Sequence, residues 1–89
     1  MIVKLENLGI VNKNKVTLKT KKGTITIWFS YETAISFEYL DEGKNATVTI
    51  KNYWNTTTGK LLNEVEPNKN LRVDKETFNR KLESCLNLL

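Results

Sequence analysis

The side chains best suited to catalysis are scarce in this sequence. It contains no histidine and one cysteine, Cys85, so histidine acid–base chemistry, a cysteine–histidine pair and the usual zinc ligand sets are all excluded. Paired carboxylates are the remaining possibility, and nothing in the sequence aligns the candidates, which are Glu32, Glu38, Asp41 and Glu42. We therefore expect a protein that is not an enzyme and that uses no cofactor and no metal.

A Gly-Lys step in the stretch NYWNTTTGKLLN, residues 52–63, raises the question of a nucleotide-binding loop. Such a loop needs a second glycine five positions before Gly59, where this chain has Trp54, and Ser or Thr after the lysine, where it has Leu61. The motif is absent, and two interpretations remain. The stretch begins a short helix near 57–65 that is capped by Asn55, Thr56 or Thr57, with Trp54 beneath it. Alternatively, it forms a recognition edge made of Tyr53, Asn55, Thr57 and Lys60.

The net charge of +4 is concentrated near the N-terminus. Residues 1–31 hold six lysines and one glutamate, which favours an acidic partner, either a nucleic acid or an acidic protein surface. Twelve lysines against two arginines weaken the nucleic-acid interpretation, because arginine is the usual bidentate reader of phosphate and guanine. If nucleic acid does bind, the predicted contacts are Lys13, Lys15, Lys19, Lys21 and Lys22.

The first two-thirds of the chain alternates apolar and polar residues, and the last third has helical spacing. We expect one domain, 1–89, that begins with an antiparallel meander. The predicted strands are about 2–11, 15–20, 24–31, 34–40 and 46–53, with turns at 12–14, 21–23 and 41–44. Parity favours a loop with an odd number of residues, for example the three residues 32–34, which keeps Phe37 and Tyr39 beside Ile25 and Ile27. The alternative is one bent strand over 24–40.

The opposite face of this sheet is mainly threonine, serine and lysine, with Glu38 and, if the last strand reaches it, Tyr53; Trp28 is the anomaly. Trp28 is either a cross-strand packing residue or a binding anchor, and aromatic residues are enriched at binding hot spots. The predicted partner-binding residues are Trp28, Tyr53, Lys15, Lys19, Lys51, Asn55 and Lys60.

A C-terminal helix over 74–88 is predicted to cover the apolar face. Asp74 is a suitable N-cap, and the apolar stripe is Phe78, Leu82, Cys85 or Leu86, and Leu89. Cys85 is then a small buried hydrophobe rather than a reactive thiol. The predicted fold class is α+β, with the C-terminal helix packed on one face of the sheet.

The blocks FSYETAISF at 29–37 and NYWNTTTGKLLN at 52–63 resemble small uncharacterised proteins of bacteriophages and related mobile elements. The shared pattern is S-Y-x-T-x-I, a turn, then N-Y-W-x-x-T-T-G-K-x-L-N, and it covers roughly residues 28–65. Leu61 stands where that pattern often has histidine, and Asn55 where it often has serine. The resemblance implies a phage accessory role and supplies no catalytic residue.

These observations together predict a binding protein. The first hypothesis is a phage or mobile-element protein that binds and modulates a host protein, in host takeover or anti-defence, including the anti-CRISPR type of inhibitor. The alternative is a non-specific nucleic-acid-binding protein that uses the basic sheet face. The start of the chain lacks the pattern of a signal peptide, so we expect it in the host cytoplasm, as a monomer or homodimer and without a membrane.

Overall fold

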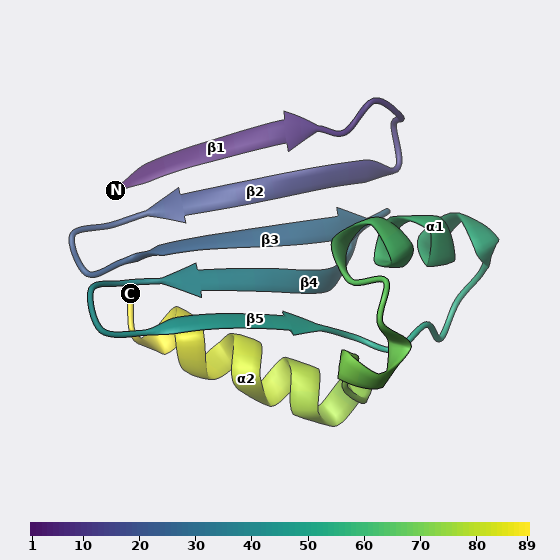
Figure 1. The fold of residues 1–89 in the computed structure, drawn as a ribbon. Coiled ribbons are helices and arrows are strands. Elements are labelled where there is room, and N and C mark those ends of the chain that lie inside the picture. The colour runs from purple at the N-terminus through teal and green to yellow at the C-terminus, as the bar shows by residue number, and fades with distance from the viewer.

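The computed structural model describes all of residues 1–89 and contains one antiparallel sheet with two α-helices (Figure 1). Strands adjacent in sequence are adjacent in the sheet, in the order β1-β2-β3-β4-β5. The predicted α+β class and the five-stranded meander are therefore confirmed. The elements are β1 Ile2–Asn7, β2 Lys13–Lys19, β3 Thr24–Ser30, β4 Thr33–Leu40, β5 Asn45–Thr49, α1 Thr56–Val65, the 3-10 helix η1 Lys69–Leu71 and α2 Lys75–Asn87.

β1 and β5 are both shorter than predicted, and each has a local reason. β1 ends at Asn7, whose side-chain amide donates to the carbonyl of Ile10 at 2.7 Å, and Gly9 then takes a φ of +100°. β5 ends at Thr49 because the chain turns to a new neighbour: Ile50 forms a parallel bridge with Val73. The prediction of a strand over 46–53 was thus wrong in its second half.

β3 and β4 form a hairpin, so the alternative of one bent strand over 24–40 is excluded. The predicted three-residue loop was also wrong, because the turn holds only Tyr31 and Glu32, with Tyr31 at φ +56°. The parity is restored by an irregularity: Trp28 pairs with Ser36 and Phe29 with Ala34, so that Ile35 is an extra residue. Phe37 and Tyr39 consequently lie opposite Ile27 and Ile25, as predicted.

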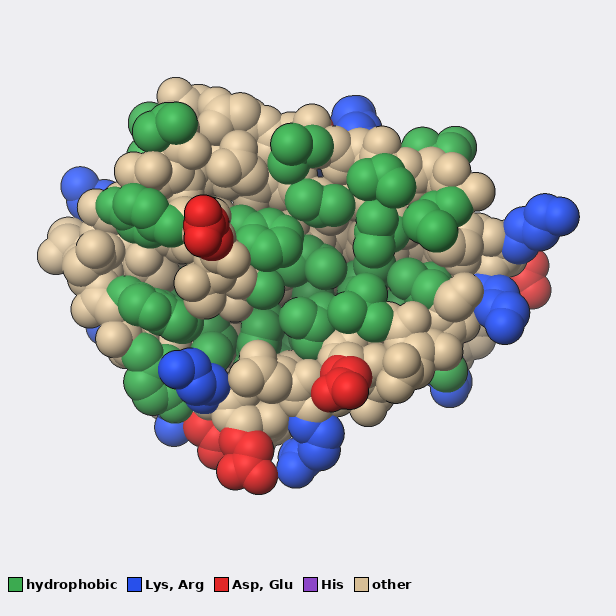
Figure 2. Space-filling model, turned by 180° about the vertical axis from the view of Figure 1, so that it is seen from behind, with side chains coloured by type: hydrophobic (Ala, Val, Ile, Leu, Met, Phe, Trp, Pro, Cys, Tyr) green, Lys and Arg blue, Asp and Glu red, His purple; other side chains and the backbone are tan.

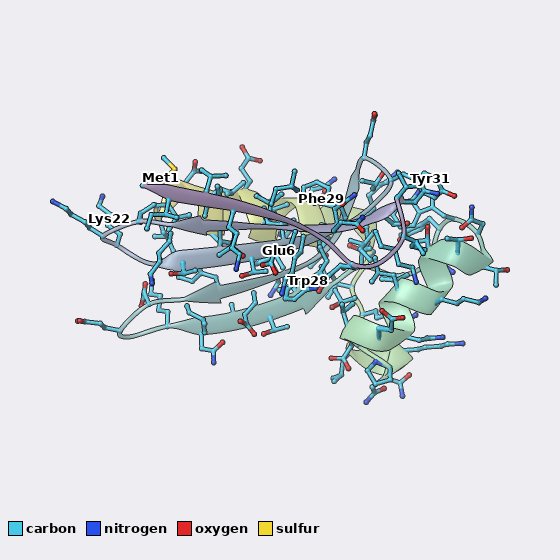
Figure 3. The ribbon with its side chains drawn as sticks, turned by 90° about the horizontal axis from the view of Figure 1, so that it is seen from above. Met1, Glu6, Lys22, Trp28, Phe29 and Tyr31 are labelled. Atoms are coloured by element: carbon cyan, nitrogen blue, oxygen red, sulfur yellow. The ribbon has the colours of Figure 1, made fainter.

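The two helices cover opposite faces of the sheet. α2 packs on the face of Phe37, whose ring meets that of Phe78 edge to face at 5.6 Å between centroids. α1 lies over the other face near the end of β3, where the Thr58 hydroxyl is 2.7 Å from the hydroxyl of Ser30. Figure 3 shows this division, with Phe29 pointing to the side of α2 and Trp28 to the side of α1.

α2 has the predicted cap and stripe. The Asp74 carboxylate accepts a hydrogen bond from the amide of Thr77 at 2.8 Å. Phe78 is fully buried, and Leu82, Cys85 and Leu89 are partly buried against the core, whereas Leu86 is exposed. Burial raises the pKa of the Cys85 thiol, which agrees with its predicted role as a small hydrophobe.

α2 covers only part of its face, because one helix is too narrow for five strands. It packs beside β5, and neither helix lies over the half of the same face that belongs to β1 and β2 (Figure 1). Val3 and Leu5, which pair with Leu18 and Val16, are 62% and 71% exposed. Figure 2 views this side and shows apolar side chains spread across it. We call Val3, Leu5, Val16 and Leu18 the open apolar face.

The Phe37–Phe78 contact predicts a large loss of stability on truncation. Phe78→Ala should lower the free energy of unfolding by roughly 3–5 kcal/mol, because a cavity forms between α2 and the sheet. Leu86→Ala, an exposed position on the same helix, is the matched control and should cost less than about 1 kcal/mol. Urea denaturation measures both. Equal losses for the two variants would show that α2 does not pack through Phe78.

The turn between β4 and β5 contains a carboxylate whose protonation lowers the stability of the fold. Asp41 accepts hydrogen bonds from the Tyr39 hydroxyl and the Gly43 amide, both at 2.8 Å. These bonds, the one from Tyr39 foremost, lower the pKa of Asp41 below its usual 3.8. Since the folded pKa lies below the unfolded one, the stabilisation is present above about pH 4 and is lost as the pH falls through the folded pKa.

Asp41→Asn should therefore flatten the loss of stability on acidification, because asparagine keeps one of the two acceptor oxygens and does not titrate. The measurement is the free energy of unfolding from neutral pH to below pH 4, and the control is Glu42→Gln, whose carboxylate accepts no hydrogen bond. The acid slope of the control should match the wild type. If the stability of Asp41→Asn falls with acid as steeply as that of the wild type, Asp41 is not a carboxylate that links stability to pH.

Candidate anion-binding cleft

Trp28 lies at the boundary between the sheet and α1. It pairs with Lys15 on one side and Ser36 on the other, and it is partly buried against the core. A hollow of about 510 Å³ beside it is lined by Leu8 from the first turn and by Leu61 and Val65 of α1, among others. This environment favours the packing alternative for Trp28 over the binding anchor.

The aromatic pair of the 52–63 stretch lies away from Trp28. Tyr53 follows β5, and its hydroxyl accepts from the amide of Lys75 at 3.2 Å, so it belongs to the start of α2. Trp54 stacks edge to face on Tyr53 at 5.9 Å and is 40% exposed rather than tucked beneath α1. The structure therefore does not bring Tyr53 into the surface of Trp28.

Asn55 is the N-cap of α1. Its side-chain oxygen accepts from the Thr58 amide at 3.0 Å, and its carbonyl accepts from the Gly59 amide at 2.9 Å. The interpretation of this stretch as a capped helix is confirmed, and α1 buries Leu61, Leu62 and Thr58. Asn55 was also predicted to bind a partner, but its side-chain oxygen is occupied by the cap.

The lysines of the N-terminal half do not form one basic patch. Lys13 is buried, and its ammonium lies 3.7 Å from the Glu64 carboxylate of α1. Lys15 lies 3.8 Å from Glu6 on β1. Lys19, Lys21 and Lys22 are exposed at the other end of β2 and in the turn that follows, so β2, a strand about 20 Å long, separates the two groups.

A second basic cluster, which the sequence did not indicate as a unit, lines a cleft of about 450 Å³. Its cationic side chains are Lys51, Lys60, Lys69 and Arg72, and its remaining lining residues are Asn52, Thr56, Gly59 and Asn63. Neither an acidic nor an apolar residue lines it. None of the cationic side chains is within ion-pair distance of a carboxylate. We call this group the basic cleft.

Three segments build the basic cleft. Thr56, Lys60 and Asn63 lie at i, i+4 and i+7 of α1, on the side opposite its buried leucines. Lys51 follows β5, and its amide donates to the carbonyl of Val73 at 2.8 Å, which holds the residues after η1 beside the end of β5. Gly59 makes room for Asn52, since a Cβ at Gly59 would lie 2.9 Å from the Asn52 amide nitrogen.

Arg72 is the fixed cation of the basic cleft. It is only 7% exposed, and its guanidinium donates to the carbonyl of Glu66 at 2.9 and 3.1 Å and to the side-chain oxygen of Asn63 at 2.9 Å. These acceptors are neutral, so the positive charge of Arg72 has no counterion in the chain. A neighbouring anion would interact with it more strongly than in bulk water, because burial reduces screening.

Asp74 is an acidic residue whose charge interacts with Lys51 of the basic cleft. The hydrogen bonds from Thr77 are the main reason that the pKa of Asp74 is lowered, and the positive charge of Lys51 contributes less. Asp74 is used as the cap of α2, which leaves the cluster with an excess of positive charge. The arrangement suits a carboxylate or phosphate group better than a neutral, largely apolar small molecule, for which pockets have apolar linings.

Of the predicted partner-binding residues, only Lys51 and Lys60 meet in the basic cleft. Lys69 and Arg72 were missed because they lie in an irregular segment after Pro67, with no periodicity to assign them a face. The helical spacing of Thr56, Lys60 and Asn63 was a usable signal for one wall of the basic cleft.

Comparison with family models, curated proteins and solved structures gave no match. No helix is long and apolar enough to cross a membrane.

The cap role of Asn55 gives a prediction that separates structure from binding. Asn55→Ala should lower the free energy of unfolding by about 1 kcal/mol, because the Thr58 amide loses its acceptor. Asn55→Ser, the residue that the related pattern often has there, preserves a capping oxygen and should cost much less. Thermal or urea unfolding measures the difference. Equal losses for alanine and serine would mean that the cap does not stabilise α1.

Proposed function

We propose that this chain is a small accessory binding protein that docks an acidic segment of a partner protein in the basic cleft. The observation that carries the proposal is the convergence of Lys51, Lys60, Lys69 and Arg72 on one cleft with no carboxylate within ion-pair distance of any of them. A cluster of uncompensated cations is costly to maintain without an anionic ligand, since like charges repel. An acidic group placed in the basic cleft removes that repulsion.

A protein partner is favoured over a nucleic acid by the shape of the charge distribution. Nucleic-acid binding uses a groove that follows successive phosphates, usually with aromatic side chains on which bases stack. The basic cleft is compact and has no aromatic residue in its lining, and Lys13 and Lys15 are engaged by Glu64 and Glu6. A short acidic segment, with carboxylates a few ångströms apart, fits such a compact site.

The resemblance of residues 28–65 to phage proteins suggests where this binding is used. We propose that the partner is a host protein and that docking modulates it, as in host takeover or anti-defence. Action by occupancy, in which the bound protein blocks or alters a surface of the host protein, is consistent with a sequence that has no histidine and no aligned pair of carboxylates. Electrostatic steering of a cationic domain to an acidic surface would speed the encounter.

The test is affinity capture from nuclease-treated lysate of the candidate host, with mass spectrometry and then titration of the captured protein. Three forms are compared: wild type, the cleft variant Lys51→Glu/Lys60→Glu, and the control Lys21→Glu/Lys22→Glu, which has the same net charge as the cleft variant. We expect wild type and control to capture the same protein. The cleft variant should bind it at least about 30-fold more weakly, which corresponds to about 2 kcal/mol.

Two results would overturn the proposal. Equal weakening of both variants would show that net charge, not the basic cleft, controls binding. The second result has two parts: the protein captures only nucleic acid from lysate without nuclease, and it is retained on single-stranded DNA at about 50 mM salt. Together they would favour the nucleic-acid alternative. In that case affinity should fall with salt at a log–log slope near −0.7 for each phosphate neutralised.

A further inference from the structure

The two edges of the sheet differ in how they are protected. At β5, the Val73 amide donates to the carbonyl of Thr49 at 2.8 Å, and α2 packs alongside. At β1, no other segment lies on the outer side, and Val3 and Leu5 are largely exposed. Open, apolar edge strands are templates for pairing with another chain, and natural proteins usually block them. β1 has neither a proline nor a covering loop.

The alternation of hydrogen bonds between β1 and β2 shows which backbone groups of β1 are free to pair with another strand. The Leu8 amide donates to the carbonyl of Lys13, so bonded pairs with β2 fall on every second residue from Leu8 backwards. The backbone groups of Val3, Leu5 and Asn7 therefore point outwards. The side chains of Val3 and Leu5 lie on the open apolar face, whereas those of Lys4 and Glu6 lie on the opposite face, with Thr17 and Lys15.

We infer that β1 pairs with β1 of a second copy of this chain, antiparallel, about a two-fold axis at Leu5. In this register Leu5 lies opposite Leu5 of the second copy, and Val3 lies opposite Asn7 of the second copy, so all outward backbone groups are matched. Lys4 then lies opposite Glu6 of the second copy on the other face, at a non-hydrogen-bonded position where side chains approach most closely. The same ion pair occurs twice because of the symmetry.

The charges of Lys4 and Glu6 favour this register over the two registers in which the axis is shifted by one residue. Moving the axis by one residue to Lys4 would place Lys4 opposite Lys4, and moving it to Glu6 would place Glu6 opposite Glu6. Like charges directly opposite each other destabilise a strand pair, whereas opposite charges stabilise it. Glu6 is already held near Lys4 and Lys15 of its own chain, at 3.7 and 3.8 Å, so it is positioned to accept a further lysine. Figure 3 looks onto this edge and shows Glu6 on the side of α1.

The pairing also extends the open apolar face. Because the axis is perpendicular to the sheet, the open apolar faces of both copies lie on the same side and meet at the two Leu5 side chains. Val16 and Leu18, which pair with Leu5 and Val3, continue the apolar surface on each side of the junction. The apolar side chains that one copy leaves exposed thereby contact those of the other, and this contact adds hydrophobic burial to the backbone hydrogen bonds. The basic cleft lies at the far side of each copy and stays free.

The experiment uses two charge variants in mixture. Lys4→Glu gives a chain with acidic residues at positions 4 and 6, and Glu6→Lys gives one with basic residues at both. Each variant alone should self-associate about tenfold more weakly than wild type, because both cross-strand pairs become repulsive. An equimolar mixture should associate at least as well as wild type, since both pairs are again opposite in charge. Sedimentation velocity from micromolar to millimolar concentration measures this, and Lys22→Glu is the control.

A second measurement needs no variant. Amide hydrogen exchange of wild type should slow at Val3, Leu5 and Asn7 as the concentration rises, because only these amides of β1 gain partners. Amides of Lys4 and Glu6 are already bonded to β2 and should be protected at every concentration. The inference is overturned if wild type stays monomeric at millimolar concentration, if the mixture associates no better than each variant alone, or if dimers form without slower exchange at Val3 and Leu5.

Discussion

The pairing of β3 with β4 is the constraint on which the rest of the structure depends. These central strands contribute Ile25, Ile27, Phe37 and Tyr39 to one face, and α2 can pack only where those side chains form a continuous apolar surface. A two-residue turn by itself would have directed Ser36 and Glu38 to that face. The extra residue Ile35 corrects the parity, and Tyr31 adopts the positive φ that such a short turn requires.

The same short turn and irregularity also set the position of α1. Ser30, the last residue of β3, reaches Thr58 of α1, and Ile35 is buried beside them in a cleft beneath the start of the helix. Lys13 of β2 is tied to Glu64 at the other end of α1. α1 is therefore fixed to the sheet by a buried hydroxyl pair and an ion pair, in addition to its leucines. That fixed position holds Lys60 and Asn63 over the segment that contains Arg72.

Both candidate interaction surfaces arise from the small size of the covering layers. Two short helices cannot cover a five-stranded sheet, so β1 and β2 keep an open apolar face on one side. On the opposite side, α1 sits at one end, and the return of the chain from α1 to α2 leaves the basic cleft between them. One surface offers apolar area and unpaired backbone, and the other offers uncompensated charge. They are separate in space, so the proposed pairing through β1 leaves the basic cleft of each copy open.

The sequence by itself determined the strand order, the two faces of the sheet and the cap of α2, and it indicated a short helix near 57–65, because each depends on neighbours close in the chain. Period-two alternation, Asp74 and Asn55 before helical spacing, and short turns are all local signals. Only the tertiary structure decided the ends of β1 and β5, the extra residue in β4 and the side of the sheet to which α1 returns. The bridge between Ile50 and Val73 joins segments with no local signal for each other, and it brings Lys51 close to the segment of Lys69 and Arg72, opposite Lys60 of α1. Trp28 and Tyr53 were grouped by strand alternation, which ceases to apply once β5 ends at Thr49 and the chain leaves the sheet.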